Sequence, residues 1–323
     1  MKKIKGIIQH LYPFEKLTLI YVLFAHIVAN IFNFKLNYMK QYFFSQVFSG
    51  LMFGYLLCGG YFLFFFIRNR NDNKALTAMR QYYFNARFFL DSIRIVSAIT
   101  VTLVFFCNLK QIIPLVHPKL FDSLFWNLDI FFHFGLSPTL TALKIPKDSL
   151  AWPVMDKFYL TFFLKNMFAP WIFIIQRRSK RLRDAVITAV CLLWITGGLV
   201  YFLLPAMGPC YFKPELFKGL NMPVNHKLQE LLLTEYARFI NNPLSYQAKT
   251  FYGIAAMPAL HIAVPLLFTL FCLRLNKYLF IIFLFYTALI WIGSIMLGWH
   301  YAIDGYAGAL LALTIFGLTS MLK

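Results

Sequence analysis

The stretch YLFIIFLFYTALIWIGSIML, residues 278–297, decides the fold class because it contains no charged side chain. An α-helix needs about 20 mostly apolar residues to cross the hydrocarbon core of a bilayer, and this stretch is long enough. The whole chain shares its character: 60% of the 323 residues are hydrophobic and 13% are charged, whereas a soluble domain has about 25% charged residues. The sequence therefore predicts an integral membrane protein.

Working outward from this stretch, we find seven further apolar runs and expect an all-α, polytopic membrane bundle with about eight transmembrane helices. A transmembrane barrel would show weakly alternating segments of about ten residues, and these runs do not alternate. The eight expected spans are residues 17–34, 45–67, 93–113, 156–176, 185–205, 257–273, 278–297 and 301–322.

The chain is strongly basic, with 31 Lys and Arg against 12 Asp and Glu and a net charge of +19. Such an excess can mark nucleic-acid binding, but here the basic residues gather in the loops after the second, fourth and sixth spans. Loops of this kind remain in the cytoplasm. We therefore expect both termini in the cytoplasm, the long loop 206–256 on the periplasmic, exterior or luminal side, and no nucleic-acid partner.

Ionisable side chains stand out at the end of the seventh run and the start of the eighth, because charges in a bilayer are expensive. His300 and Asp304 are four residues apart, so on a helix their Cβ atoms would lie about 5–6 Å apart on one face. A carboxylate so placed can hold one imidazole N–H and direct the other ring nitrogen toward a substrate. The alternative is a structural ion pair at the membrane surface.

His261 lies at the start of the sixth span, so the predicted topology places it at the same outer level as His300. Two histidines and one aspartate are then expected to converge just below the outer interface. Small residues in both segments would let the helices approach closely; they are Ala259, Ala263, Gly305 and Gly308.

Two chemistries suit a pair of histidines with an aspartate. Such a set can hold zinc, but no HExxH motif occurs and no further ligand is evident in the spans. In phosphoryl transfer, one imidazole attacks phosphorus and the second protonates the leaving oxygen. We favour phosphoryl transfer and expect no metal.

These residues resemble signature motifs of the type-2 phosphatidic acid phosphatase superfamily. The similar segments are Pro-x-Leu-His at 258–261, Gly-Trp-His-Tyr-x-x-Asp at 298–304, the Tyr-to-Gly-Pro segment 201–209 and the Asp-Gly-Pro-Thr segment within 126–139. They look most like the inositol-phosphorylceramide-synthase-like (inositolphosphotransferase) branch, which is also similar to the sphingomyelin synthases. The likeness covers roughly 120–312, so we expect a catalytic membrane domain at 120–323 and N-terminal helices of unclear role at 1–119.

The resemblance implies roles for three residues. His300 would be the nucleophile that forms a phosphohistidine, Asp304 would orient it, and His261 would be the general acid for the leaving group. The family needs neither a metal nor another cofactor. Its substrates are membrane lipids, and the site would face the periplasm, the cell exterior or a lumen.

The sequence departs from the family where phosphate-binding cations are usual. No Lys-x6-Arg-Pro motif occurs, and Ser294 stands where the family's phosphatases have an arginine six residues before the second histidine. Lys165, inside the fourth span, is our best replacement candidate, although it could instead snorkel to the interface. Arg238 and Lys249 of the outer loop are further candidates, as alternatives to plain solvated charges.

These observations predict a phosphotransferase that moves a phospho-head-group between lipids. The runner-up is a phosphatase acting on phosphatidic acid or a polyprenyl diphosphate, and a third possibility is a transporter or scaffold. An amphipathic stretch, residues 228–240, could cover the site as a lid or be an ordinary surface helix.

Overall fold

The computed structural model describes residues 10–176, 179–243 and 256–321, except for the side chains of 164–167. The described chain is helical and contains no strand, which confirms the predicted all-α class. The helices in the expected spans are α2 (Pro13–Ile31), α3 (Lys40–Arg68), α5 (Ala86–Val116), α8 (Ala151–Tyr159), α9 (Thr161–Ile175), α10 (Lys180–Leu203), α13 (Leu260–Cys272), α14 (Lys277–Met296) and α15 (Ala302–Ser320).

Within the described residues, six helices are long and apolar enough to cross a membrane: α2, α3, α5, α10, α14 and α15. A seventh span results if Ala151–Phe163 and Phe168–Ile175, which cover α8 and most of α9, are counted together, although these two segments are bent by 48° relative to each other. Pro170 lies inside α9 and cannot donate the hydrogen bond that would stiffen the helix near this break.

The predicted count of eight spans is not confirmed, because the sixth segment is shorter than expected. α13 has 13 residues, or about 20 Å at about 1.5 Å per residue, against a hydrocarbon core of about 30 Å. Residues 256–259 before it are not helical. They belong instead to the candidate active site described below.

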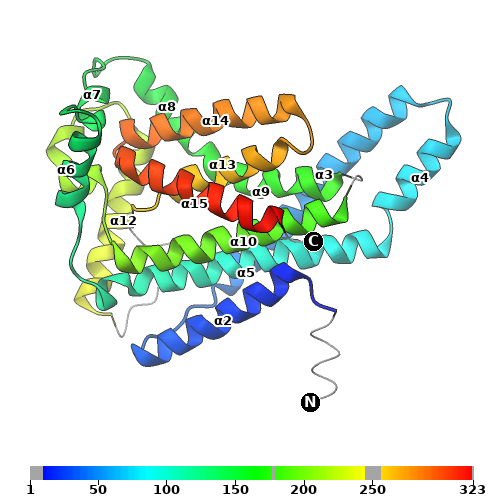
Figure 1. Cartoon of the computed structure of the whole chain (residues 1–323), viewed down its shortest axis with the longest axis horizontal. Helices are drawn as coiled ribbons and strands as arrows, with labels where there is room; N and C mark the ends of the chain where they lie inside the picture. Colours follow the sequence, from blue (N-terminus) through cyan, green and yellow to red (C-terminus); the bar gives the residue numbers. More distant parts are fainter. Residues whose placement is uncertain (1–9, 177–178, 244–255, 322–323) are drawn as a thin grey trace.

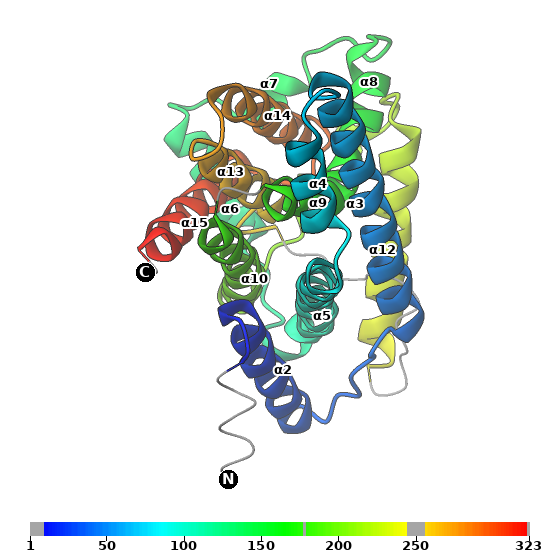
Figure 2. The same ribbon diagram turned by 90° about the vertical axis from the view of Figure 1, so that its right-hand side faces the viewer.

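The long helices lie side by side in one bundle. Figure 1 shows α5 and α10 running along the molecule, with α13, α14 and α15 on one side and α2 on the other. Figure 2 looks along the bundle and shows α10 between the α13–α15 group and the pair α2 and α5. The N-terminal helices therefore pack directly on the C-terminal ones.

Short helices cover one end of the bundle, at the left in Figure 1. They include α6, α7 and α12, and α13 and α15 begin at this end. The α4 helix projects from the opposite end, where the turn between α13 and α14 and the start of α10 also lie. The short elements are α4 (Asn73–Tyr83), α6 (Asp122–Phe132), α7 (Pro138–Ala142), α11 (Pro209–Phe212), η1 (Pro214–Phe217) and α12 (Pro223–Asn241).

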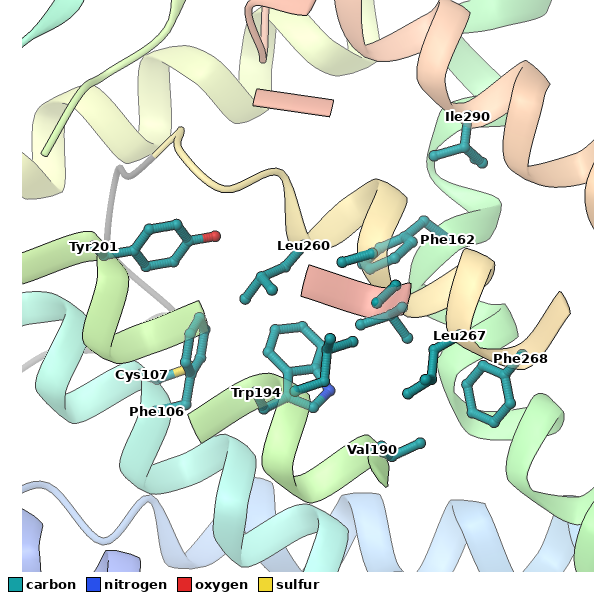
Figure 3. Packing of buried hydrophobic residues seen from close by; sticks show 14 of the residues in the cluster. Phe106, Cys107, Phe162, Val190, Trp194, Tyr201, Leu260, Leu267, Phe268 and Ile290 are labelled. Carbon is teal, nitrogen blue, oxygen red and sulfur yellow. The ribbon is translucent and has the colours of Figure 1, made fainter. Parts of the chain in front are cut away.

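The largest apolar core joins the N-terminal and C-terminal helices. Phe106 of α5 packs on Trp194 and Tyr201 of α10, with ring centroids 4.9 and 6.0 Å apart. Figure 3 shows this group next to Leu260, the first residue of α13. Packing against the N-terminal helices thus supports the end of the bundle at which α13 begins.

Candidate active site

The starts of α13 and α15 are joined through their backbones. The N–H of Ala259 donates to the carbonyl of Asp304 at 2.9 Å. Gly308, one turn further along α15, faces Ala259 so closely that an added Cβ would lie 2.5 Å from the Ala259 carbonyl oxygen. The absence of a side chain at Gly308 therefore permits the contact that brings the two histidine motifs together.

The structure brings His261, His300 and Asp304 into one line. The Nδ1 atom of His261 lies 3.0 Å from Nε2 of His300. On the other side of that ring, Nδ1 of His300 lies 3.5 Å from Oδ2 of Asp304. His300 and Asp304 are buried, and His261 is partly exposed.

The position of His300 differs from the expected shared helix face. His300 precedes the N-cap Tyr301 and lies outside α15, which begins at Ala302. The N–H groups of Trp299 and His300 both point to the Ser294 carbonyl, at 2.9 and 3.3 Å. The loop between α14 and α15 thus holds His300 in place, and the carboxylate comes from the first turn of the next helix.

Asp304 is fixed by a capping interaction. Its Oδ2 atom accepts the N–H of Tyr301 at 2.8 Å, as an acidic residue in the first turn of a helix often does. In the described residues, neither Oδ1 of Asp304 nor Nδ1 of His300 has a hydrogen-bond partner. The 3.5 Å between Nδ1 of His300 and Oδ2 of Asp304 is longer than the usual hydrogen-bond range of about 2.7–3.2 Å.

Asp129 of α6 is a supporting residue to which sequence reasoning gave no role. Its two carboxylate oxygens accept the N–H groups of Ala302 and Ile303 at 2.9 and 2.8 Å. Burial raises the pKa of Asp129, and the two backbone donors oppose that rise. Two N–H groups at the N-terminus of α15 are therefore bound to the carboxylate of Asp129.

A second buried carboxylate, Asp122, supports the same loop. It accepts the N–H groups of Met207 and Gly208 and the hydroxyl of Tyr301, which directly follows His300. The signal in the sequence was the presence of two acids seven residues apart in a largely apolar segment. It could have suggested a structural role, but their partners lie more than 80 residues away.

Aromatic rings surround His261. Its ring centroid lies 4.4 Å from that of Phe162, 5.5 Å from that of Tyr159 and 6.2 Å from that of Phe163. All three belong to α8 and α9, the bent pair. His261 therefore has aromatic neighbours on the side where α8 and α9 lie.

Of the three candidate phosphate-binding side chains, the structure describes only that of Arg238. Arg238 on α12 is exposed and forms an ion pair with Glu235 at 2.6 Å, so its guanidinium already has a partner. Lys249 lies outside the described residues, and so does the side chain of Lys165, although α9 itself passes the site at Phe162.

The amphipathic stretch 228–240 forms most of α12, at the same end of the bundle as the site (Figure 1). The Asn225 side chain on this helix accepts a hydrogen bond from Trp299 Nε1 at 2.7 Å. Gln229 donates to the Leu297 carbonyl at 2.9 Å. α12 is therefore attached to the loop that carries His300.

No arrangement of three or more His, Cys, Asp or Glu side chains suited to a metal ion occurs in the described part of the chain. The two histidines instead face each other, with their nearest nitrogens 3.0 Å apart.

One family model matches the C-terminal part of the chain. The model of the PAP2 superfamily matches residues 124–318, a range that contains both histidine segments and Asp129. No curated protein and no solved structure matches the chain at a significant level. Members of the superfamily are generally phosphatases or phosphotransferases, which suggests an enzyme acting on lipids. Because the matched range covers more than half of the chain and includes the whole histidine–aspartate line, this protein belongs to the PAP2 superfamily.

Proposed function

We propose that the protein is a membrane lipid phosphotransferase that moves a phospho-head-group from a glycerophospholipid to a lipid or sugar hydroxyl. The observation that carries the proposal is the line Asp304–His300–His261, with contacts of 3.5 and 3.0 Å. This order places a carboxylate behind one imidazole and a second imidazole in front of it. These three side chains are the groups that the two half-reactions of a phosphohistidine mechanism require.

In the first half-reaction, Nε2 of His300 attacks the phosphorus of the donor lipid. The new N–P bond forms as the P–O bond to the leaving alkoxide breaks, and His261 gives its proton to that oxygen. Asp304 holds the proton on Nδ1 of His300, which leaves Nε2 as the free electron pair. In the second half, His261 removes the acceptor hydroxyl's proton, the acceptor oxygen attacks phosphorus, and the N–P bond breaks.

Phosphorus must enter between the two imidazoles. A nitrogen–nitrogen distance of 3.0 Å leaves no room for it, so one ring has to move. His261 is the mobile candidate because it is partly exposed, whereas His300 is buried and held by its loop. We expect substrate binding to rotate His261 against the rings of Phe162 and Tyr159.

Two observations favour transfer over hydrolysis. Ser294 is fully buried and presents its carbonyl to the His300 loop, so this position supplies no cation. A terminal phosphate dianion needs more cationic contacts than a phosphodiester monoanion does. The aromatic wall around His261 also limits water, which would compete with an acceptor alcohol.

Phosphatase activity on phosphatidic acid or a polyprenyl diphosphate is the second candidate. It would use the same three residues, with water as the acceptor. Membership of a superfamily of phosphatases and phosphotransferases supports both reactions, so the acceptor distinguishes them.

The test uses purified full-length protein in detergent with labelled glycerophospholipids, with and without added alcohol or ceramide acceptors. We expect head-group transfer by the wild type, none by His300→Ala, and a phosphorylated His300 after acid-free quenching. Asp304→Asn should lower kcat by about 10³–10⁴-fold through the wrong tautomer. Turnover by His300→Ala would contradict the nucleophile assignment, and release of phosphate regardless of acceptor would identify a phosphatase.

A further inference from the structure

A group of polar side chains lies inside the bundle next to the active site, on helices that mostly precede the family match. It consists of Tyr21 on α2, Cys107 and Lys110 on α5, and Tyr201 on α10; we call it the Lys110 cluster. The Lys110 Nζ atom lies 5.4 Å from the ring centroid of Tyr201 and 6.0 Å from that of Phe106.

Tyr201 connects this cluster to the active site. Figure 3 shows its hydroxyl pointing toward Leu260. Leu260 directly precedes His261 in the chain. One aromatic ring therefore separates the Lys110 ammonium from the start of α13.

Lys110 has no carboxylate to balance it in the described part of the chain, where all ion pairs involve other residues. Its Nζ lies near Phe106, one turn earlier on α5. The side chain thus runs back along α5, in the usual direction of side chains on a helix. An ammonium held this way among apolar helices calls for an anion.

A second unsatisfied group lies in the same cluster. Tyr21 is 3% exposed, and its hydroxyl has no hydrogen-bond partner among the described residues. Buried hydroxyls almost always have a partner. Tyr21 and Phe106 also approach Gly198 of α10 together, so this hydroxyl lies beside the aromatic surface on which Lys110 rests.

We infer that Lys110, with the Tyr21 hydroxyl, binds the anionic phosphate oxygens of the lipid substrate. The inference rests on the proposed function and gives the N-terminal helices a part in it. The four-carbon stem of lysine is flexible, so the ammonium can leave the Tyr201 ring for a phosphate, with which it forms a stronger, charge-assisted hydrogen bond. Lys110 would then supply a positive charge for the phosphate. The region matched by the family model does not supply one at position 294, where this chain has a serine.

The experiment compares Lys110→Met, Lys110→Arg and the matched surface control Lys119→Met in the full-length protein. Lys119 follows α5 and is exposed. KM and kcat are measured with phosphatidylinositol and with phosphatidic acid in detergent. The dissociation constants of both lipids are measured separately on the same variants in a His300→Ala background, and thermal unfolding is recorded for every protein.

We expect Lys110→Met to raise KM and the dissociation constant at least tenfold, with an unchanged or higher melting temperature. Lys110→Arg should stay within about threefold of wild type because it keeps the charge, and Lys119→Met should match wild type. Unchanged lipid affinity in Lys110→Met would overturn the inference, and so would equal loss in both Lys110 variants together with a lower melting temperature.

The binding arm separates this inference from the proposed function. If the wild type turns over neither lipid, the proposed function fails. Weaker binding by Lys110→Met in the His300→Ala background would then still support the anion site, and unchanged binding would still reject it.

Discussion

At the scale of single residues, the position of His300 depends on carboxylates outside the line that it forms with His261. Asp304 lies behind the ring, but Asp129 fixes the backbone that carries both residues, through two hydrogen bonds of 2.8 and 2.9 Å. His261, His300 and Asp304 could be predicted together because each lies at the end of an apolar run. Asp129 could not, because its partners are backbone N–H groups 173 and 174 residues away.

The substitution Asp129→Asn tests this dependence. The amide keeps one acceptor and places an NH₂ group against the other backbone N–H, so a buried donor loses its partner at about 1–3 kcal/mol. We expect a lower melting temperature and a kcat reduced about tenfold, with KM nearly unchanged. Thermal unfolding and lipid turnover measure both effects.

Asp148→Asn is the matched control, because Asp148 is exposed and the same substitution there should alter neither quantity. If Asp129→Asn and Asp148→Asn behaved alike, Asp129 would not position the His300 loop.

At the scale of elements, contact between α13 and α15 decides whether the two histidine motifs meet. The small residues predicted to allow close approach are not equivalent. Gly308 faces the Ala259 backbone, whereas Gly305 is covered by the Trp291 indole. Composition showed that the helices could approach, and only their packing showed which glycine makes the contact.

Gly308→Ala should separate the two helices, because its Cβ would lie 2.5 Å from a backbone oxygen that cannot move away freely. Overpacking of this kind destabilises by about 1–3 kcal/mol, and we expect turnover to fall at least tenfold. Thermal unfolding and lipid turnover in detergent are the measurements.

Gly317→Ala, on the same helix, is the control, since nothing lies within 4 Å of a Cβ there. It should be neutral or stabilise by up to about 1 kcal/mol. Equal behaviour of the two alanine variants would show that the contact between α13 and α15 does not limit activity.

The bent pair α8 and α9 carries a separate prediction at Lys165. Phe162, three residues earlier, packs on His261, so Lys165 lies within one turn of a residue that lines the site. Lys165→Met keeps length and apolarity and should raise KM for the lipid about tenfold while leaving the melting temperature unchanged.

The same substitution at exposed Lys157 on α8 should leave KM as in wild type. A wild-type KM in Lys165→Met would assign the lysine to structure and leave Lys110 as the cation to test.

At the scale of the whole molecule, the bundle separates two chemically different ends. The basic loops lie at the α4 end, and α13 and α15, whose starts carry the histidine–aspartate line, begin at the other end, where α6 and α12 lie (Figure 1). The positive-inside bias then predicts an orientation with the site away from the cytoplasm. Ion pairs at the basic end, such as Arg183 with Asp91 at 3.1 Å, join α5 to α10 and hold the two halves together there.

Cysteine labelling tests this orientation, and the native cysteines should react little because all five are buried. Lys74→Cys on α4 should react with an impermeant maleimide only after the membrane is opened. Glu230→Cys on α12 should react in sealed cells or right-side-out vesicles. The reverse pattern would place the site in the cytoplasm.

The sequence by itself determined the helical membrane class and the three residues of the candidate site. Apolar runs of span length and charges at their ends are local features, and any fold that buries the runs must respect them. Only the tertiary structure decided the short α13, the place of His300 outside a helix, the supporting role of Asp129 and the position of Lys110 beside Tyr201. Each of these depends on which backbone groups and rings meet across the bundle, and long-range packing, not spacing along the chain, determines those contacts.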